Sequence, residues 1–226
     1  MTPDQQRPWS EPSGRPVHRR ARAARSSMPV TFAVMAVCVA VQLAEFAVPG
    51  LDYEYGLKAR YAADEPWTLL TSAFLHDPSS LAHIGTNMLS LWIFGRMIEP
   101  MVGSLRFAGL LLASILAGSV GVLLWESQGA YTVGMSGGIF GLIGGVLVLQ
   151  LLLRQNIAGT LALLGLNALV PLMVPNISWQ GHVGGFIGGL LYSAAVIAPW
   201  ARRRLRRIPQ PFGGQAPPPP PPPAGA

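Results

Sequence analysis

The stretch TVGMSGGIFG, residues 132–141, sets one serine, Ser136, among glycines at the start of an apolar run that reaches Leu153. Glycine and serine let transmembrane helices approach one another closely, and a serine hydroxyl can hydrogen-bond to its own helix. Helix packing therefore explains this motif when the motif is taken alone. The alternative is a chemical role for the hydroxyl, which depends on the polar groups that the rest of the chain places near Ser136.

The composition is typical of a membrane protein. Half of the 226 residues are hydrophobic and 12% are charged, the mean hydropathy is +0.40, and soluble domains carry about 25% charged residues. The one cysteine, Cys38, lies in the first apolar run, which excludes an intrachain disulfide and a metal site built on thiolates. The net charge of +6 comes from arginine blocks beside apolar runs. We therefore expect contact with an anionic lipid leaflet and no binding of nucleic acid.

Apolar runs predict six transmembrane helices. The first, residues 28–48, is long enough to span and lacks a small-residue cleavage site after it, so it is not a signal peptide. The predicted fold is an all-α integral membrane protein in which residues 28–200 form one six-helix bundle. A long outer loop, residues 49–80, separates the first two helices. The later runs cover approximately residues 81–98, 105–125, 133–153, 157–175 and 181–200.

Both chain ends are predicted to lie in the cytoplasm, as in a multi-pass protein of the cell's inner or plasma membrane. Of 16 lysines and arginines, only Lys58 and Arg60 fall in segments expected outside, and the positive-inside rule places the other fourteen in the cytoplasm. Residues 1–27 are expected to be a disordered, basic N-terminus. Residues 201–226 form a basic tail with seven consecutive prolines. This polyproline II segment is either a solvated tail or an adaptor ligand.

Three polar side chains are predicted to lie at one depth in the membrane. Counted from the cytoplasmic end of each span, Ser136, His182 and His83 lie about 27, 30 and 25 Å along their helices. The hydrocarbon layer is about 30 Å thick, so all three lie near its outer edge. Helix packing does not require this agreement, and polar residues inside a membrane are usually functional because placing them there is costly.

Ser136 and His182 are the predicted catalytic pair. Smooth glycine faces let two helices approach until a serine Oγ and an imidazole are within hydrogen-bond distance, as a general base requires. No acidic residue lies near His182 in its span, so we expect a dyad that needs no metal and no cofactor. A histidine that only links two helices is the alternative. The glycines at helical spacing are Gly137, Gly141 and Gly145 beside the serine, and Gly185 and Gly189 beside the histidine.

His83 and Asn87, one helical turn apart, are candidates for stabilising a negative charge. Side chains at i and i+4 share a helix face and lean toward the N-terminus, which is here the outer side. The Asn87 amide, His83 and the first backbone N–H groups of the fourth helix can therefore face a carbonyl attacked by Ser136. A polar clamp between helices is the other interpretation.

Together, these segments resemble the rhomboid family of intramembrane serine proteases over about residues 57–200. The resemblance implies a six-helix fold around a water-filled cavity that opens to the outside, with Ser136 as nucleophile and His182 as general base. It implies an oxyanion site made by Asn87, His83 and the Ser136 amide. The motifs that carry it are HIGTN (83–87), FGRMIE (94–99), GMSG (134–137) and GHVGG (181–185).

The resemblance also assigns supporting roles and an activity. Gly134 opens the turn into the serine, Phe140 packs against the base, and Gly185 belongs to the motif of the last span. The implied reaction is hydrolysis of transmembrane protein substrates near their outer ends, within the lipid bilayer. The alternative is a noncatalytic rhomboid-like protein that binds membrane proteins. The sequence indicates neither the substrate nor the oligomeric state.

Two features depart from the family pattern in the first loop. Trp67 is followed by Thr68, where the family often has arginine. His83 follows His76 by seven positions, which is longer than the family's usual spacing. We expect His76 to be an interfacial residue with a structural role.

Overall fold

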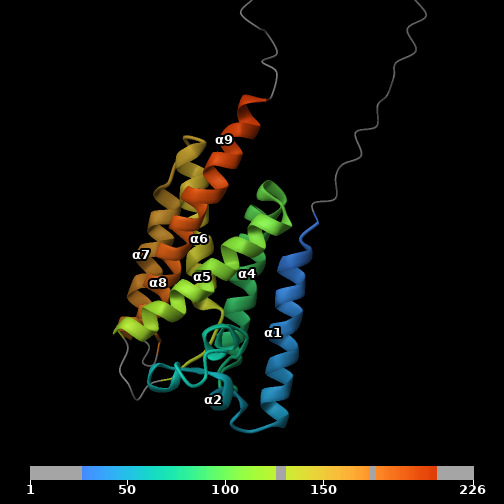
Figure 1. Ribbon diagram of the computed structural model, residues 1–226, viewed down its shortest axis with the longest axis vertical. Coiled ribbons are helices and arrows are strands. Elements are labelled where there is room, and N and C mark those ends of the chain that lie inside the picture. The colour runs from blue at the N-terminus through green and yellow to red at the C-terminus, as the bar shows by residue number, and fades with distance from the viewer. Residues whose placement is uncertain (1–26, 126–130, 174–176, 208–226) are drawn as a thin grey trace, which may run out of the picture.

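A bundle of long helices makes up most of the computed structural model, which describes residues 27–125, 131–173 and 177–207 (Figure 1). The start of the first helix and the end of the last lie toward the same end of the bundle. The long helices are α1 (Pro29–Ala47), α4 (Leu81–Val102), α5 (Ser104–Trp125), α6 (Ser136–Leu152), α7 (Ala158–Met173) and α8 (Trp179–Tyr192), which continues through a π-helical turn, Ser193–Ile197, into α9 (Ala198–Arg206).

Each predicted apolar run lies largely within a helix, and two of the helices extend beyond the approximate ends of their runs. The second helix continues past residue 98 to Val102, and Pro100 lies within its last turn. The last helix continues past the predicted boundary at residue 200 to Arg206, since arginine is a good helix former. The predicted disorder of the N-terminal segment and the proline-rich tail concerns residues outside the described ones.

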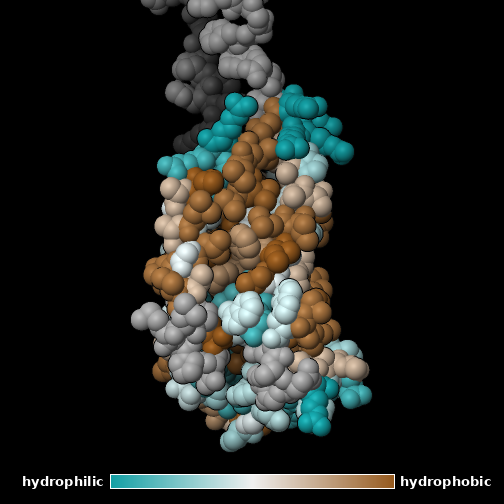
Figure 2. Space-filling model, turned by 90° about the vertical axis from the view of Figure 1, so that its left-hand side faces the viewer, coloured by the Kyte–Doolittle hydropathy of each residue, from teal (hydrophilic) through white to brown (hydrophobic). Residues whose placement is uncertain are grey.

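The surface of the bundle is divided into an apolar middle and polar ends. Among the described residues, three stretches are long and apolar enough to cross a membrane: α1, α5, and the continuous helix from Trp179 to Arg206. Shorter apolar helices are α6 and the part of α7 from Ala158 to Leu169. In Figure 2 hydrophobic side chains cover the middle of the face shown, and hydrophilic ones gather toward its two ends. Such a distribution suits a molecule whose middle is surrounded by lipid.

Short elements fill the connection between α1 and α4. They are α2 (Leu51–Tyr55), β1 (Leu57–Lys58), a 3₁₀ turn (Ala59–Tyr61), α3 (Thr68–Thr71) and a second 3₁₀ turn (Ser72–Phe74). The strand β1 pairs antiparallel with β2 (Tyr131–Thr132), so that Leu57 lies opposite Thr132. This pairing ties the connection to the segment that leads into α6.

Glycines bring α6 and α8 into backbone contact. A Cβ added at Gly185 would collide with the carbonyl oxygen of Gly137, and one added at Gly189 would collide with that of Gly141. The prediction that these two glycine faces pack together is therefore confirmed. A neighbouring face of α8 meets small residues of α5 in the same way. Gly145, predicted on the same face, instead lies beside a leucine of α5 and the serine of the π-helical turn.

A buried carboxylate on α4 holds the start of α1. Glu99 is 1% exposed, and its oxygens accept the N–H groups of Val30 and Thr31 at 3.0 and 2.9 Å and the Thr31 hydroxyl at 2.7 Å. The Ser104 hydroxyl, at the start of α5, donates to the same carboxylate at 2.7 Å. The residue that precedes α1 supplies no side-chain cap. Glu99 therefore replaces that cap and joins three helices.

Candidate active site

Ser136 is the first residue of α6 and follows a turn that only glycine fits. Gly134 has a φ of +116°, which L side chains rarely adopt. Its N–H donates to the carbonyl of Ser72 at 2.9 Å. A Cβ at Gly134 would also lie 2.7 Å from Nε2 of His83. Glycine is thus needed here both for the backbone conformation and for the close approach of the histidine.

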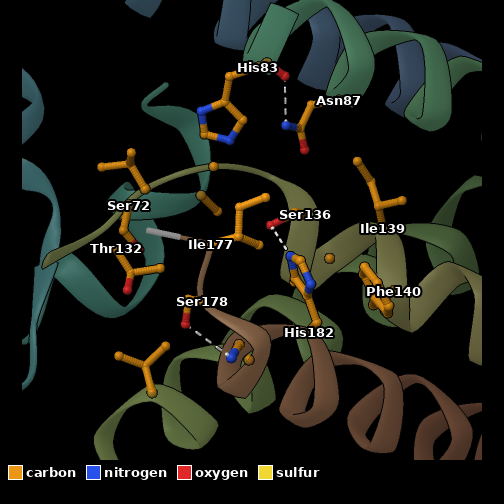
Figure 3. Close-up of a pocket in the computed structure, with 18 of the residues that line it drawn as sticks. Ser72, His83, Asn87, Thr132, Ser136, Ile139, Phe140, Ile177, Ser178 and His182 are labelled. Atoms are coloured by element: carbon orange, nitrogen blue, oxygen red, sulfur yellow. Dashed lines mark hydrogen bonds between the residues drawn. The ribbon is translucent and has the colours of Figure 1, made fainter. Parts of the chain in front are cut away.

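The structure brings Ser136 and His182 together. Nε2 of His182 lies 3.0 Å from Oγ of Ser136 (Figure 3). His182 stands in the first turns of α8, and the Ser178 hydroxyl caps this helix by accepting the Gly181 N–H at 3.3 Å. Nδ1 of His182 is buried and has no hydrogen-bond partner among the described residues. Within the described part of the chain, the hydrogen bond at this point thus joins two side chains, Ser136 and His182.

Phe140 fixes the plane of the histidine ring. Its ring centroid lies 4.1 Å from that of His182, and the two planes are 10° apart. Phe140 is one helical turn after Ser136, so both side chains are on the same face of α6. The stacking covers one face of the imidazole and leaves its Nε2 edge directed at the hydroxyl, as Figure 3 shows.

His83 and Asn87 lie on the other side of Ser136 from His182 (Figure 3). The Asn87 amide donates one N–H to the His83 carbonyl at 2.8 Å, and its Oδ1 is buried with no partner among the described residues. The Asp77 backbone N–H donates to His83 Nδ1 at 3.3 Å. Because an amide N–H can only donate, Nδ1 is unprotonated, and in the neutral ring Nε2 carries the proton. That N–H is on the side of the ring that faces Gly134.

One cavity of about 1140 Å³ contains all four side chains in its wall: Ser136, His182, His83 and Asn87. A second, mostly apolar cavity of about 440 Å³ shares His182 with it and lies among residues of α6, α7 and α8. The first cavity is large enough for a peptide segment and water. In the part of the chain that the structure describes, no group of three or more His, Cys, Asp or Glu side chains is arranged to hold a metal ion.

His76, expected to be interfacial with a structural role, is buried within the protein beside this site. Its side chain has no exposed surface, and its ring packs edge to face on the His83 ring with centroids 5.2 Å apart. Burial, with a smaller effect of the nearby His83 charge, lowers the pKa of His76 to about 4. The physical reason for its position is a hydrogen bond from its backbone N–H to the carboxylate of Glu45.

Comparison with known proteins identifies the family. The family model described as "Rhomboid domain" matches residues 63–199. The chain belongs to the rhomboid family. It is an integral membrane protein, and its described part is mostly helical.

Two bacterial relatives of this rhomboid chain are from Bacillus subtilis (strain 168). The rhomboid protease GluP is 36% identical over 148 residues, which are 62% of this chain and 28% of GluP. The putative rhomboid protease YdcA is 30% identical over 158 residues, 67% of this chain and 78% of YdcA. RHOMBOID-like protein 5 of Arabidopsis thaliana is 33% identical over 151 residues, 63% of this chain and 48% of that protein.

Some contacts of the site in this rhomboid chain lie outside the motifs. The carbonyl of Ser72 holds Gly134, and Glu45 holds the loop segment beside His83. Both residues bond to backbone groups far away in the sequence, and neither belongs to a motif. An acidic residue in an otherwise apolar span was the one signal that pointed to Glu45.

Proposed function

We propose that this rhomboid-family chain is an intramembrane serine endopeptidase that cleaves transmembrane protein substrates. The observation that carries the proposal is the 3.0 Å separation between Ser136 Oγ and His182 Nε2 in the wall of a cavity. In this mechanism His182 takes the hydroxyl proton as Oγ attacks the scissile carbonyl. It then returns the proton to the leaving amine, and a water molecule hydrolyses the acyl-enzyme by the same route.

His83 and Asn87 serve as oxyanion donors in this proposal. The His83 Nε2–H is directed toward Gly134, and the Asn87 amide has a second N–H besides the one that bonds to the His83 carbonyl. The Ser136 backbone N–H, at the start of α6, has no partner within its own helix. Donors held at fixed positions stabilise the charge that develops in the transition state.

We further propose six membrane spans with both termini in the cytoplasm. The distribution of arginine supports this orientation, as do the described ends of the bundle, which lie toward the same end (Figure 1). Helix α6 has 17 residues, a length of about 26 Å, which is shorter than the hydrocarbon layer. Its first residue, Ser136, then lies below the outer membrane surface, and the connection between α1 and α4 lies outside.

The test is labelling of the purified protein with a serine-directed fluorophosphonate, combined with cleavage of a model transmembrane substrate. We expect labelling at Ser136, and we expect Ser136→Ala and His182→Ala each to abolish cleavage. The double variant should be no worse than either single one, because the two residues act as a unit. The matched controls are Cys38→Ala and added chelator, both of which should leave cleavage intact.

Two results would contradict the proposal. Protein-dependent cleavage that persists in Ser136→Ala would exclude this serine as nucleophile. Folded wild-type protein that is never labelled and cleaves none of the substrates would indicate a noncatalytic rhomboid-like protein that binds membrane proteins.

A further inference from the structure

Glu45 is a buried carboxylate of α1 that has no part in the dyad. Its side chain is 3% exposed and lies near the end of α1 opposite to the one held by Glu99. An ionisable group within a membrane helix is costly unless it has a partner. Here both carboxylate oxygens accept the same donor, the backbone N–H of His76, at 3.0 and 3.3 Å.

The next amide along the chain is tied to the candidate oxyanion site. The N–H of Asp77 donates to Nδ1 of His83 at 3.3 Å. Successive amides of one loop segment, residues 76–77, are therefore held from two sides, by α1 and by the first turn of α4. The His76 ring adds an edge-to-face contact with the His83 ring at an interplanar angle of 63°.

The bond from Asp77 decides which nitrogen of His83 carries the proton. A neutral imidazole in water exchanges between two tautomers, and the hydrogen bond made by one nitrogen fixes the state of the other. Here the amide occupies Nδ1, and Nε2–H is left to donate toward Gly134 and the serine. Loss of the loop segment would release both the orientation of the ring and its tautomer.

We propose that Glu45 is a positioning residue that holds the His76–Asp77 backbone so that His83 presents Nε2–H at the oxyanion site. Its effect on turnover rests on the protease function proposed above, whereas its effect on the tautomer does not. Glu45 touches none of the reacting groups. It acts through two hydrogen bonds and the loop segment between them.

The experiment records long-range ¹H–¹⁵N spectra of the full-length protein labelled with ¹⁵N-histidine in detergent micelles. The chain has four histidines, so single substitutions assign the signals. We expect His83 as the Nε2–H tautomer in wild type and in Glu45→Gln, which keeps an acceptor oxygen. In Glu45→Leu we expect a mixture of both tautomers. In Glu45→Asp, whose side chain is one methylene shorter, the fraction of His83 in the Nε2–H form should lie between these two results. If the leucine variant does not fold, this fraction in Glu45→Asp tests the proposal.

Turnover of the model substrate is the second readout. We expect Glu45→Leu to lower kcat about tenfold or more, with KM nearly unchanged, which is less than the roughly 100- to 1000-fold loss on removal of an oxyanion donor. Gln42→Leu is the matched control. Gln42 is one turn earlier on α1 and 4% exposed, and its side-chain amide has no partner among the described residues. This control should keep the wild-type tautomer and kcat.

The two proposals fail in different ways. A folded Glu45→Leu or Glu45→Asp protein in which His83 stays entirely in the Nε2–H form would overturn the role of Glu45, whatever the activity. A shifted tautomer in a protein whose wild type never cleaves substrate would support the positioning role and contradict the protease function.

Discussion

At Gly134 two independent requirements exclude a side chain. The backbone has a φ of +116°, and the space that a Cβ would occupy is within 2.7 Å of His83 Nε2. Gly50 meets the first requirement alone, since its φ is +88° and a Cβ there would have nothing within 4 Å. The two glycines therefore separate backbone strain from displacement of the histidine.

We expect Gly134→Ala to lower cleavage at least tenfold more than Gly50→Ala does. Both substitutions strain the backbone by about 1–2 kcal/mol, but only Gly134→Ala displaces the His83 ring from its position beside Ser136. Initial rates and melting temperatures of the two variants, compared with wild type, check this. Equal rates in both variants, at equal stability, would show that His83 has no catalytic part.

A second expectation at this scale concerns pH. The pKa of His76 is about 4 in the folded protein and 6.5 ordinarily. Between these values the unfolded chain binds a proton that the folded chain does not, so stability falls as pH falls from 6.5 toward 4. The total loss is on the order of 3 kcal/mol. In thermal unfolding, His76→Phe, which keeps a ring but cannot be protonated, should show a smaller decrease than wild type. Parallel curves for the two proteins would contradict a buried neutral His76.

The sequence allowed four residues of the candidate site to be predicted, but not Glu45. Ser136, His182, His83 and Asn87 were found because each is a polar group in an apolar run, which is a local signal. The structure places all four in one cavity wall. Glu45 was missed although it too is a polar group in an apolar run. Its partner is a backbone amide 31 residues away, and no pattern in the sequence encodes that contact.

Among the elements, α6 and α8 depend on the absence of side chains where they meet. Gly185 faces the backbone of α6 with no space for a methyl group, whereas a Cβ on Gly165 of α7 would meet nothing within 4 Å. Overpacking of a tight contact costs about 1–3 kcal/mol. A glycine that is free of contacts gains helix propensity when it is changed to alanine.

We therefore expect Gly185→Ala to lower the melting temperature and to remove fluorophosphonate labelling of Ser136, because separating the helices breaks the bond to His182. Gly165→Ala should match or exceed wild type in both assays. If Gly185→Ala were as stable and as reactive as the control, this result would contradict a backbone contact between α6 and α8 that leaves no space for a methyl group.

Helix α1 should depend strongly on Glu99. Glu99→Leu leaves the buried N–H of Thr31 and the partly buried N–H of Val30 without their partner, and an unsatisfied buried donor costs about 1–3 kcal/mol. We expect a marked drop in thermal stability and faster hydrogen exchange at Val30 and Thr31. Glu54→Leu, which removes an exposed carboxylate of α2, is the control and should stay within about 0.5 kcal/mol of wild type. Unchanged exchange at the start of α1 in Glu99→Leu would show that the cap is dispensable.

The long helices were predictable and the loop elements were not. Hydropathy is summed over about 20 neighbouring residues, so each apolar run was found with its ends correct to a few residues. The strand β1 has only two residues, and its partner Tyr131–Thr132 is more than 70 residues away. Its conformation depends on that pairing, and local composition does not predict it.

At the scale of the whole molecule, an apolar middle separates two polar ends (Figure 2). Residues of the helix that ends the bundle, Arg202–Arg204 and Arg206, are exposed at one of these ends. In the proposed topology that end is cytoplasmic, and the connection between α1 and α4 is outside.

A reporter enzyme that is active only outside the cytoplasm should therefore be silent when fused after Ala226. The same reporter inserted after Asp64, in the connection between α1 and α4, should be active. Activity of the fusion at Ala226 would contradict the proposed six-span topology and, with it, the position of Ser136 and His182 near the outer edge of the membrane. Equal expression of the two fusions, measured by immunoblot, is the control.

The small β1–β2 pair also constrains how the protein is made. Residues 57, 72 and 83 all leave the ribosome before α5, yet each contacts the segment that precedes Ser136. Ser136 can therefore take up its position only after residues 57, 72 and 83 have been synthesised and brought beside the segment that precedes it. His182, the general base of the proposed mechanism, lies in α8 and is synthesised later still. In that mechanism the Ser136 hydroxyl has no base beside it until α8 has joined the bundle, so the chain has no complete active site while α8 is still being synthesised.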